Sequence, residues 1–170
     1  MKVNIIKDAR GRDIVQMDHV RFLWPNFSGR GDCKFSRDGE RNFNIVIPDP
    51  EIAEALQNNL NKYGVGWNVK IKPPREEGEA PLTYLNVKVK FNEYGPKVHL
   101  ISGDKRVMLT EETIGCLDNM DVLNADLDLR AYDGDGNYGP FRSAYLQCME
   151  VTQNIDRFSA RYADEEYPEE

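Results

Sequence analysis

Four lysines and a tyrosine recur at alternate positions in two short segments, and their chemistry suits the binding of a polyanion. Residues 67–72 and 84–91 alternate apolar and polar side chains, which is the pattern of β-strands with one buried face. Trp67 shares the apolar face and is expected in the core. If both strands lie in one sheet, its exposed face favours a ligand with phosphates and flat bases. That face carries Lys70, Lys72, Tyr84, Lys88 and Lys90.

A second group of basic and aromatic residues lies in a long polar segment, residues 26–41, and in the strand just before it. A loop of this length in a compact domain is usually functional or mobile. Cations that follow phosphates and rings that stack on bases, at about 1–3 kcal/mol per base, are typical of binders of single-stranded nucleic acid. The alternative is a mobile loop whose two phenylalanines fold back on the core. The candidates are Arg30, Lys34, Arg37 and Arg41 for phosphates, and Trp24, Phe27 and Phe35 for stacking.

Residues suited to catalysis are scarce in the chain. It has two histidines, His19 and His99, and neither lies at a metal-ligand spacing. It contains no serine elbow, phosphate-binding glycine loop or dinucleotide fingerprint. Residues 133–137 begin like a calcium loop, but Tyr138 stands where the loop requires glycine and Ala144 where it requires glutamate. We therefore expect a protein that is not an enzyme and that needs no metal or cofactor.

The net charge of −7 seems at odds with a nucleic-acid ligand until the distribution of charge is considered. Residues 163–170 carry five acids and no base, and residues 107–133 carry seven acids and one base. The rest of the chain is therefore positive by about four charges. Segregated charge of this kind can steer a charged ligand to one surface. The acidic end comprises Asp164, Glu165, Glu166, Glu169 and Glu170, with Tyr167 among them.

Size and composition indicate one soluble globular domain. The chain has 170 residues, of which 40% are hydrophobic and 30% charged. No apolar run approaches the roughly 18 residues of a membrane span, and the start of the chain lacks the apolar stretch of a signal peptide. Three cysteines without a Cys-x-x-Cys pair predict neither a disulfide framework nor a zinc site. We expect a cytoplasmic protein with one domain at 1–162 and an acidic tail at 163–170.

Hydrophobic periodicity predicts mostly strands. Strands are expected at 14–24, 42–48, 67–72, 84–91, 126–132 and 141–151, with a hairpin at 97–109. Asp49 and Pro50 predict the start of a helix that buries Leu56, Leu60 and Tyr63. A second short helix follows Thr110, and residues 1–13 form either a flexible solvated arm or a contact arm.

Short connections between these strands favour an antiparallel arrangement. The predicted fold is mainly β: an antiparallel barrel of about seven strands with two short helices, similar to the oligonucleotide-binding (OB) fold. That fold has one solvent-exposed strand face and long loops that grip single strands. The long basic segment and the lysine-bearing strands fit this arrangement.

Several stretches resemble a group of bacteriophage single-stranded DNA-binding proteins. They are residues 22–29 (FLWPNFSG), 41–48 (RNFNIVIP), 66–70 (GWNVK), 84–89 (YLNVKV) and 144–146 (AYL). The resemblance implies an OB fold and sequence-independent coating of DNA in phage replication or recombination, in the host cytoplasm. It also implies an acidic C-terminal tail that recruits replication partners. Related tails often end on an apolar residue, whereas here Tyr167 is followed by Pro168, Glu169 and Glu170.

The leading hypothesis is therefore that the lysines and the basic segment neutralise phosphates of single-stranded DNA while the aromatic rings stack on bases. The acidic tail would either recruit partners or compete with DNA for the basic surface. Two other classes remain open. One is a phage structural or protein-interaction module, for which the lysines are only a solvated surface, and the other is an inhibitor that mimics DNA with its acids. The sequence does not settle the oligomeric state.

Overall fold

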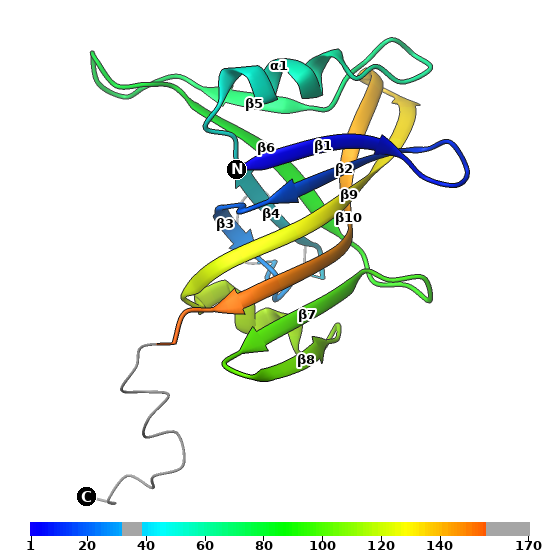
Figure 1. The fold of residues 1–170 in the computed structure, drawn as a ribbon. Helices are drawn as coiled ribbons and strands as arrows, with labels where there is room; N and C mark the ends of the chain where they lie inside the picture. The colour runs from blue at the N-terminus through cyan, green and yellow to red at the C-terminus, as the bar shows by residue number, and fades with distance from the viewer. Residues whose placement is uncertain (32–38, 156–170) are drawn as a thin grey trace, which may run out of the picture.

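Ten strands and two short helices make up the part of the chain that the computed structural model describes, residues 1–31 and 39–155 (Figure 1). The helices are α1 (Pro50–Asn58) and the 3-10 helix η1 (Ile114–Asn119). The strands are β1 (Lys2–Lys7), β2 (Asp13–Asp18), β3 (Phe22–Asn26), β4 (Arg41–Val46), β5 (Val69–Lys72), β6 (Leu82–Val89), β7 (Lys97–Ser102), β8 (Lys105–Leu109), β9 (Val122–Gly136) and β10 (Gly139–Gln153).

All ten strands belong to one sheet, whose main path runs β1-β2-β9-β10-β6-β4-β3. β5 pairs with β6, β7 pairs with β10, and β8 pairs with β7. Figure 1 shows β9 and β10 running the length of the sheet, between α1 at one end and the β7–β8 hairpin at the other. The prediction of a mainly β, OB-like fold with two short helices is confirmed. The described strands number ten rather than about seven, and they form an open sheet in which β1 and β3 end the main path.

The pairing is antiparallel except along β10, which runs parallel to both β6 and β7. The first half of β10 pairs with β6 at Ala144 and Tyr145, and its second half pairs with β7 from Cys148 to Thr152. A register shift between Leu146 and Cys148 separates the two halves. Because such a shift bends a strand, one long strand can serve two parts of the sheet.

The core lies on one face of this curved sheet. Val15, Leu129, Leu146 and Val87 project into it from four neighbouring strands and are all nearly or fully buried. Trp67 is 2% exposed, so its predicted place in the core is confirmed. No helix among residues 1–31 and 39–155 is long and apolar enough to cross a membrane.

Two predicted boundaries at the N-terminal end differ from the structure. Residues expected to form an arm instead include β1, which pairs with β2 at six consecutive positions. The single strand expected at 14–24 is divided into β2 and β3, because His19 adopts a positive φ of 57° and Val20 donates its N–H to Ala125. The division lets β2 pair with β9 while β3 pairs with β4.

Helix α1 begins as predicted but ends early. The Asp49 side chain caps it by accepting the Glu51 N–H at 2.9 Å. Leu60 and Tyr63 were expected on its buried face, but the helix stops at Asn58 and both side chains are exposed. The chain turns back beside the helix at Gly66, where a Cβ atom would lie 2.0 Å from the carbonyl oxygen of Gln57. Only glycine permits this approach, which delivers the chain into β5.

Candidate nucleic-acid interface

The predicted lysines share one face of the sheet, which we call the lysine face. Tyr84 and Lys88 alternate along β6 with the buried residues Leu85 and Val87, and Lys90 continues the alternation just after the strand. On β5, Lys70 lies opposite Tyr84 and Lys72 lies opposite Leu82. Residues opposite each other in antiparallel strands project to the same side. The structure therefore brings together the five residues Lys70, Lys72, Tyr84, Lys88 and Lys90.

The strand register extends the lysine face across the middle of the sheet. Lys88 on β6 is paired with Tyr145 on β10, and Tyr145 is paired with Arg130 on β9. Lys88 Nζ lies 5.9 Å from the centroid of the Tyr145 ring, and Arg130 Cζ lies 4.9 Å from it. One aromatic ring is thus flanked by two cations on neighbouring strands. This arrangement can hold a base against the ring while its phosphates meet the cations.

Two more aromatic rings adjoin Tyr145 on the same face. The Tyr132 ring centroid lies 5.6 Å from that of Tyr145 and 6.0 Å from that of Phe141. Phe141 is opposite Gly134, and a Cβ there would lie 2.6 Å from the Phe141 ring, so the glycine makes room for the aromatic side chain. Tyr132 is 53% exposed and so can contact a ligand directly.

A second aromatic group lies nearer the start of β6, around Tyr84. The Trp24 ring packs edge-on against Tyr84 with centroids 5.3 Å apart, and Lys72 Nζ lies 5.3 Å from the Trp24 centroid. Trp24 has a φ of 47°, an uncommon conformation for a bulky residue, and it interrupts the β3–β4 register. The interruption leaves Trp24 50% exposed beside Tyr84. The predicted grouping of Trp24 with the lysines is therefore present in the structure.

The two aromatic groups, Trp24 with Tyr84 and the rings around Tyr145, are separate stacking sites on one surface. Tyr84 and Lys88 are four residues apart on β6, which corresponds to about 13 Å along an extended strand. Between them, Asn86 donates from Nδ2 to Asn44 Oδ1 at 3.1 Å, and Asn44 donates to the Leu23 carbonyl at 3.3 Å. These hydrogen bonds link β6, β4 and β3, and so hold the three strands in place between the two stacking sites.

The predicted basic segment contributes less than expected. Phe27 is fully buried and stacks on Phe43 with ring centroids 4.9 Å apart, so it is a core residue and cannot stack on a base in this conformation. Arg41 projects to the same side of β4 as Phe43, which is the core side. Its guanidinium forms an ion pair with the Glu111 carboxylate at 3.2 Å. Arg30 is exposed, with its backbone held by the Asn26 side chain. Lys34, Phe35 and Arg37 lie outside the described residues.

The sequence matches one protein family over most of its length. Residues 6–170 match a family model described as a putative phage ssDNA-binding domain. The chain belongs to this family. No curated protein matches the sequence.

Solved structures share the fold of this family member. The single-stranded DNA-binding protein from bacteriophage Enc34 aligns with a TM-score of 0.53 and 14% identity over 93% of each chain. The same phage protein in complex with ssDNA aligns with a TM-score of 0.50 and 14% identity, over 92% of this chain and 98% of that chain. At this identity the comparisons establish a common fold.

Acidic residues occupy the other end of β9 on the lysine face. Asp126 and Asp128 project to the same side of β9 as Arg130. Asp126 accepts hydrogen bonds from the His19 backbone N–H and the Asn124 side chain. Charge is therefore segregated along the lysine face, with the cations around Tyr145 and the acids beyond them.

The Cys148 thiol lies beside these acids. Burial, and then the neighbouring Asp128 carboxylate, raise the pKa of the Cys148 thiol to about 11, so this thiol stays protonated.

A buried ionic cluster supports the cationic end from beneath. Arg142, on the opposite side of β10 from Tyr145, pairs with Asp133 at 2.8 Å and with Asp13 at 3.0 Å. Its guanidinium also lies over the Trp67 ring, 5.3 Å from the centroid. Burial opposes ionisation of both carboxyls, but their hydrogen bonds to cationic partners outweigh it and lower the pKa of Asp13 and of Asp133. The cluster ties β2, β9 and β10 together under the candidate interface.

Sequence reasoning missed four residues of the interface: Arg130, Tyr132, Phe141 and Tyr145. The alternation of side chains within the strands predicted at 126–132 and 141–151 could have indicated them, because it places them on the face of the sheet away from the core residues. The predicted tail residues Asp164, Glu165, Glu166, Tyr167, Glu169 and Glu170 lie outside the described residues. Residues 1–31 and 39–155 contain no group of three or more His, Cys, Asp or Glu side chains that could hold a metal ion.

Proposed function

We propose that this protein binds single-stranded DNA on the lysine face without reading its sequence. The observation that carries the proposal is the Tyr145 ring lying between Lys88 and Arg130, with membership of a phage ssDNA-binding family as independent support. The Enc34 protein, which shares the fold, has been solved in complex with ssDNA. The binding residues we assign on the face are Trp24, Lys70, Lys72, Tyr84, Lys88, Lys90, Arg130, Tyr132 and Tyr145.

Binding would combine two physical terms. Lysine and arginine side chains neutralise phosphates and release counterions, so that log K falls with log salt by about 0.7 for each phosphate neutralised. Bases would stack on the two aromatic stacking sites, at Trp24–Tyr84 and at Tyr145, and any base can do so because every base has a π-face. Neither term distinguishes one base from another. The protein would therefore coat exposed DNA during phage replication or recombination, without catalysing a reaction.

The basic segment and the tail complete the proposal. Arg30, Lys34 and Arg37, from the segment that follows β3, would add phosphate contacts, and Phe35 would add a stacking ring. The five acids of residues 163–170 would either recruit replication proteins or compete with DNA for the lysine face.

The direct test is titration of a labelled mixed-sequence oligonucleotide at two salt concentrations. Lys88→Glu with Lys90→Glu should weaken binding to all sequences alike, because both changes place a negative charge beside the phosphates. Lys62→Glu with Lys105→Glu is the matched control, since it makes the same change in net charge at exposed positions outside the strands that form the lysine face. Retained affinity in the first pair would refute the assigned face.

The same titration separates this proposal from its alternatives. Wild-type protein that binds no oligonucleotide at low salt would favour a structural or protein-interaction module. Binding to a basic protein instead of DNA would favour an inhibitor that presents its acids as a DNA mimic.

A further inference from the structure

The connection between β6 and β7 joins two strands that both run parallel to β10. β6 pairs with the first half of β10 and β7 with its second half, so the connection passes the register shift between Leu146 and Cys148. Figure 1 shows the connection projecting from the sheet beside the bend of β10. Tyr145 lies just before the shift. A DNA strand that continues along β10 beyond the Tyr145 ring therefore reaches this connection next.

A lysine stands at each end of the connection, on the same side of the sheet as the lysine face. Lys90 follows the buried Val89 and Lys97 precedes the buried Val98, so both project away from the core. Lys97 is paired with Cys148; burial is the main cause of the raised pKa of that thiol, and the Lys97 ammonium is near enough to oppose the rise. Both lysines are exposed, and neither forms an ion pair within residues 1–31 and 39–155. Both ammonium groups are therefore available to phosphates.

An exposed aromatic ring stands between these two lysines in the sequence. Tyr94 is 86% exposed, in a tight turn from Asn92 to Gly95. Two backbone hydrogen bonds close the turn, at 2.8 and 3.2 Å, and the Asn92 side chain accepts the Tyr94 N–H at 2.9 Å. A Cβ at Gly95 would lie 3.7 Å from the Gln147 carbonyl oxygen, so the turn is seated against β10 at the register shift. An ordered turn thus presents a tyrosine whose surface is mostly open to a ligand.

Acidic residues lie on the other side of β10 from the connection. Asp128 on β9 is paired with Cys148, and Cys148 is paired with Lys97. One row across the sheet therefore has an acid at one end and a cation at the other. Asp126 comes next on this face of β9, where it is paired with Glu150. A phosphate that reaches this row is repelled from β9 and attracted toward β7.

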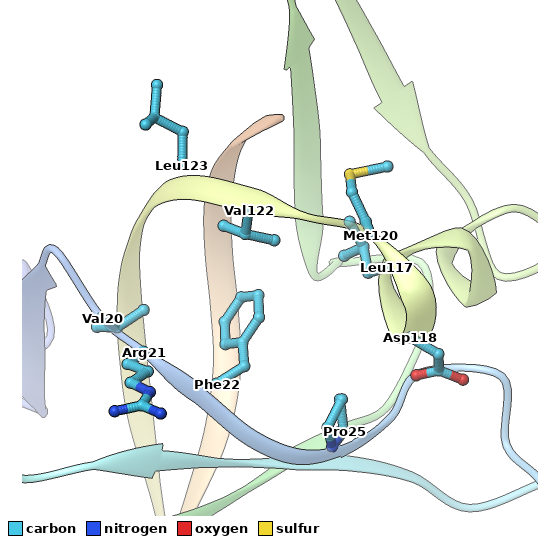
Figure 2. Close-up of a pocket in the computed structure, with 9 residues that line it drawn as sticks. All are labelled: Val20, Arg21, Phe22, Pro25, Leu117, Asp118, Met120, Val122 and Leu123. Carbon is cyan, nitrogen blue, oxygen red and sulfur yellow. The ribbon is translucent and has the colours of Figure 1, made fainter. Parts of the chain in front are cut away.

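A pocket at the start of β9, shown in Figure 2, does not offset this repulsion. The Asp118 carboxylate is in its lining, and the Arg21 guanidinium points away from its centre (Figure 2). Asp118 accepts the backbone N–H groups of Phe27 and Ser28, at 2.6 and 3.1 Å, so its carboxylate is held in place there. The lining residues therefore direct no cation into the pocket that could receive a phosphate.

We propose that single-stranded DNA follows the β6–β7 connection beyond the lysine face, where Lys97 neutralises a phosphate and the Tyr94 ring stacks on a base. Lys90 joins this part of the path to the stacking site at Tyr145. Glu93 is the one acid in the connection, so its charge together with the two lysines is positive. The inference rests on the proposed binding of DNA at Tyr145, and it adds two binding residues and a third stacking site to that surface.

Affinity and salt dependence test the two residues separately. Lys97→Gln should raise the Kd roughly five- to tenfold at about 50 mM salt and reduce the slope of log K against log salt by about 0.7, the contribution of one phosphate. Tyr94→Ala should raise the Kd about fivefold or more, whereas Tyr94→Phe keeps the ring and should bind as wild type does. Lys62→Gln with Tyr63→Ala is the matched control, since it removes a lysine and an exposed tyrosine outside the strands that form the lysine face.

Photocrosslinking tests the stacking contact directly. An oligonucleotide that contains 5-iododeoxyuridine crosslinks to aromatic side chains in contact with its bases, and trypsin releases Tyr94 in the peptide of residues 91–97. We expect crosslinks in this peptide as well as in the peptide that contains Tyr145. Tyr94→Ala should remove the first and keep the second.

The outcomes separate this inference from the proposed function. Crosslinks at Tyr145 without any in residues 91–97 would overturn the inference and leave the proposed function standing. An unchanged salt slope in Lys97→Gln, or an equal loss of affinity in the control pair, would also overturn it. Wild-type protein that binds no oligonucleotide would refute the proposed function, and the path along the connection with it.

Discussion

Lys88 and Tyr145 are neighbours in the short parallel pairing of β6 and β10, and Lys88 Nζ lies 5.9 Å from the centroid of the Tyr145 ring. The two residues are 57 positions apart in the sequence, and the parallel pairing brings them into contact. Arg130 flanks the same ring from β9. A base stacked on Tyr145 would therefore have a cation on each side for its phosphates.

Replacement of the Tyr145 ring should weaken binding to single-stranded DNA. Loss of one base–aromatic stack costs about 1–3 kcal/mol, so Tyr145→Ala should raise the Kd roughly 5- to 150-fold. Fluorescence anisotropy with a labelled oligonucleotide measures the change. Tyr138→Ala is the control, because Tyr138 is fully exposed at the β9–β10 turn and is not one of the rings that pack on Tyr132. Equal affinity in the two variants would contradict the stacking role.

The cations beside Tyr145 should determine part of the salt dependence. If Lys88 and Arg130 each neutralise one phosphate, Lys88→Gln with Arg130→Gln should reduce the slope of log K against log salt by about 1.4. Titrations at four or more salt concentrations give the slope. Lys62→Gln with Lys105→Gln removes the same charge elsewhere and should change the slope far less. An unchanged slope in the first pair would mean that these side chains do not contact phosphates.

Gly66 should be intolerant of substitution. A Cβ there would lie 2.0 Å from the Gln57 carbonyl oxygen, so Gly66→Ala must displace α1 or the start of β5, at a cost of about 1–3 kcal/mol in the free energy of unfolding. At Gly136 the added Cβ would lie 3.6 Å from the Phe141 ring, an ordinary contact, so Gly136→Ala should cost less than about 1 kcal/mol. Urea denaturation compares the two. Similar stabilities would show that α1 and β5 can move apart freely.

Stability should fall with acid through the cluster around Arg142. The pKa values of Asp13 and Asp133 are lowered in the folded state, so the unfolded chain binds more protons as pH falls. Their contribution is present above the unfolded value of about 3.9 and is lost as pH falls through the folded values. Urea midpoints at pH 7, 5, 4 and 3 measure this loss. Asp13→Asn with Asp133→Asn should flatten the dependence, and an equally steep loss would assign it to other carboxyls.

The lysine face could be predicted because strand alternation is a local property. Lys70, Tyr84 and Lys88 alternate with buried neighbours, and the sequence records that alternation directly. Tyr145 shows the same alternation between Ala144 and Leu146. Its pairing with Lys88 could not be predicted, because the register of strands distant in sequence is set by tertiary packing.

The basic segment was misread for a related reason. Basic residues interleaved with aromatics look alike in a binding loop and in a loop that packs on the core. Phe27 is buried because Asp118, 91 positions away, accepts its backbone N–H, and because Phe43 lies beneath its ring. Arg41 is turned from the lysine face by its position in the β4 register, where it meets Glu111. Neither partner can be identified from local sequence.

Removal of the acidic tail should tighten DNA binding if its charges compete for the lysine face. Residues 163–170 carry five acids, and a tethered anion near a basic surface acts as an internal competitor. Deletion of these residues should lower the Kd severalfold at low salt. The effect should shrink near physiological salt, where charges are screened over about 8 Å.

A second variant separates charge from length in this competition. Replacement of Asp164, Glu165, Glu166, Glu169 and Glu170 by their amides keeps the tail but removes its charge, so it should tighten binding as much as the deletion does. Anisotropy titrations of both variants against wild type measure the change. Affinity unchanged in both would leave recruitment of other proteins as the role of the tail. Tightening by the deletion alone would mean that the tail blocks the face by its bulk, since its charge would then be irrelevant.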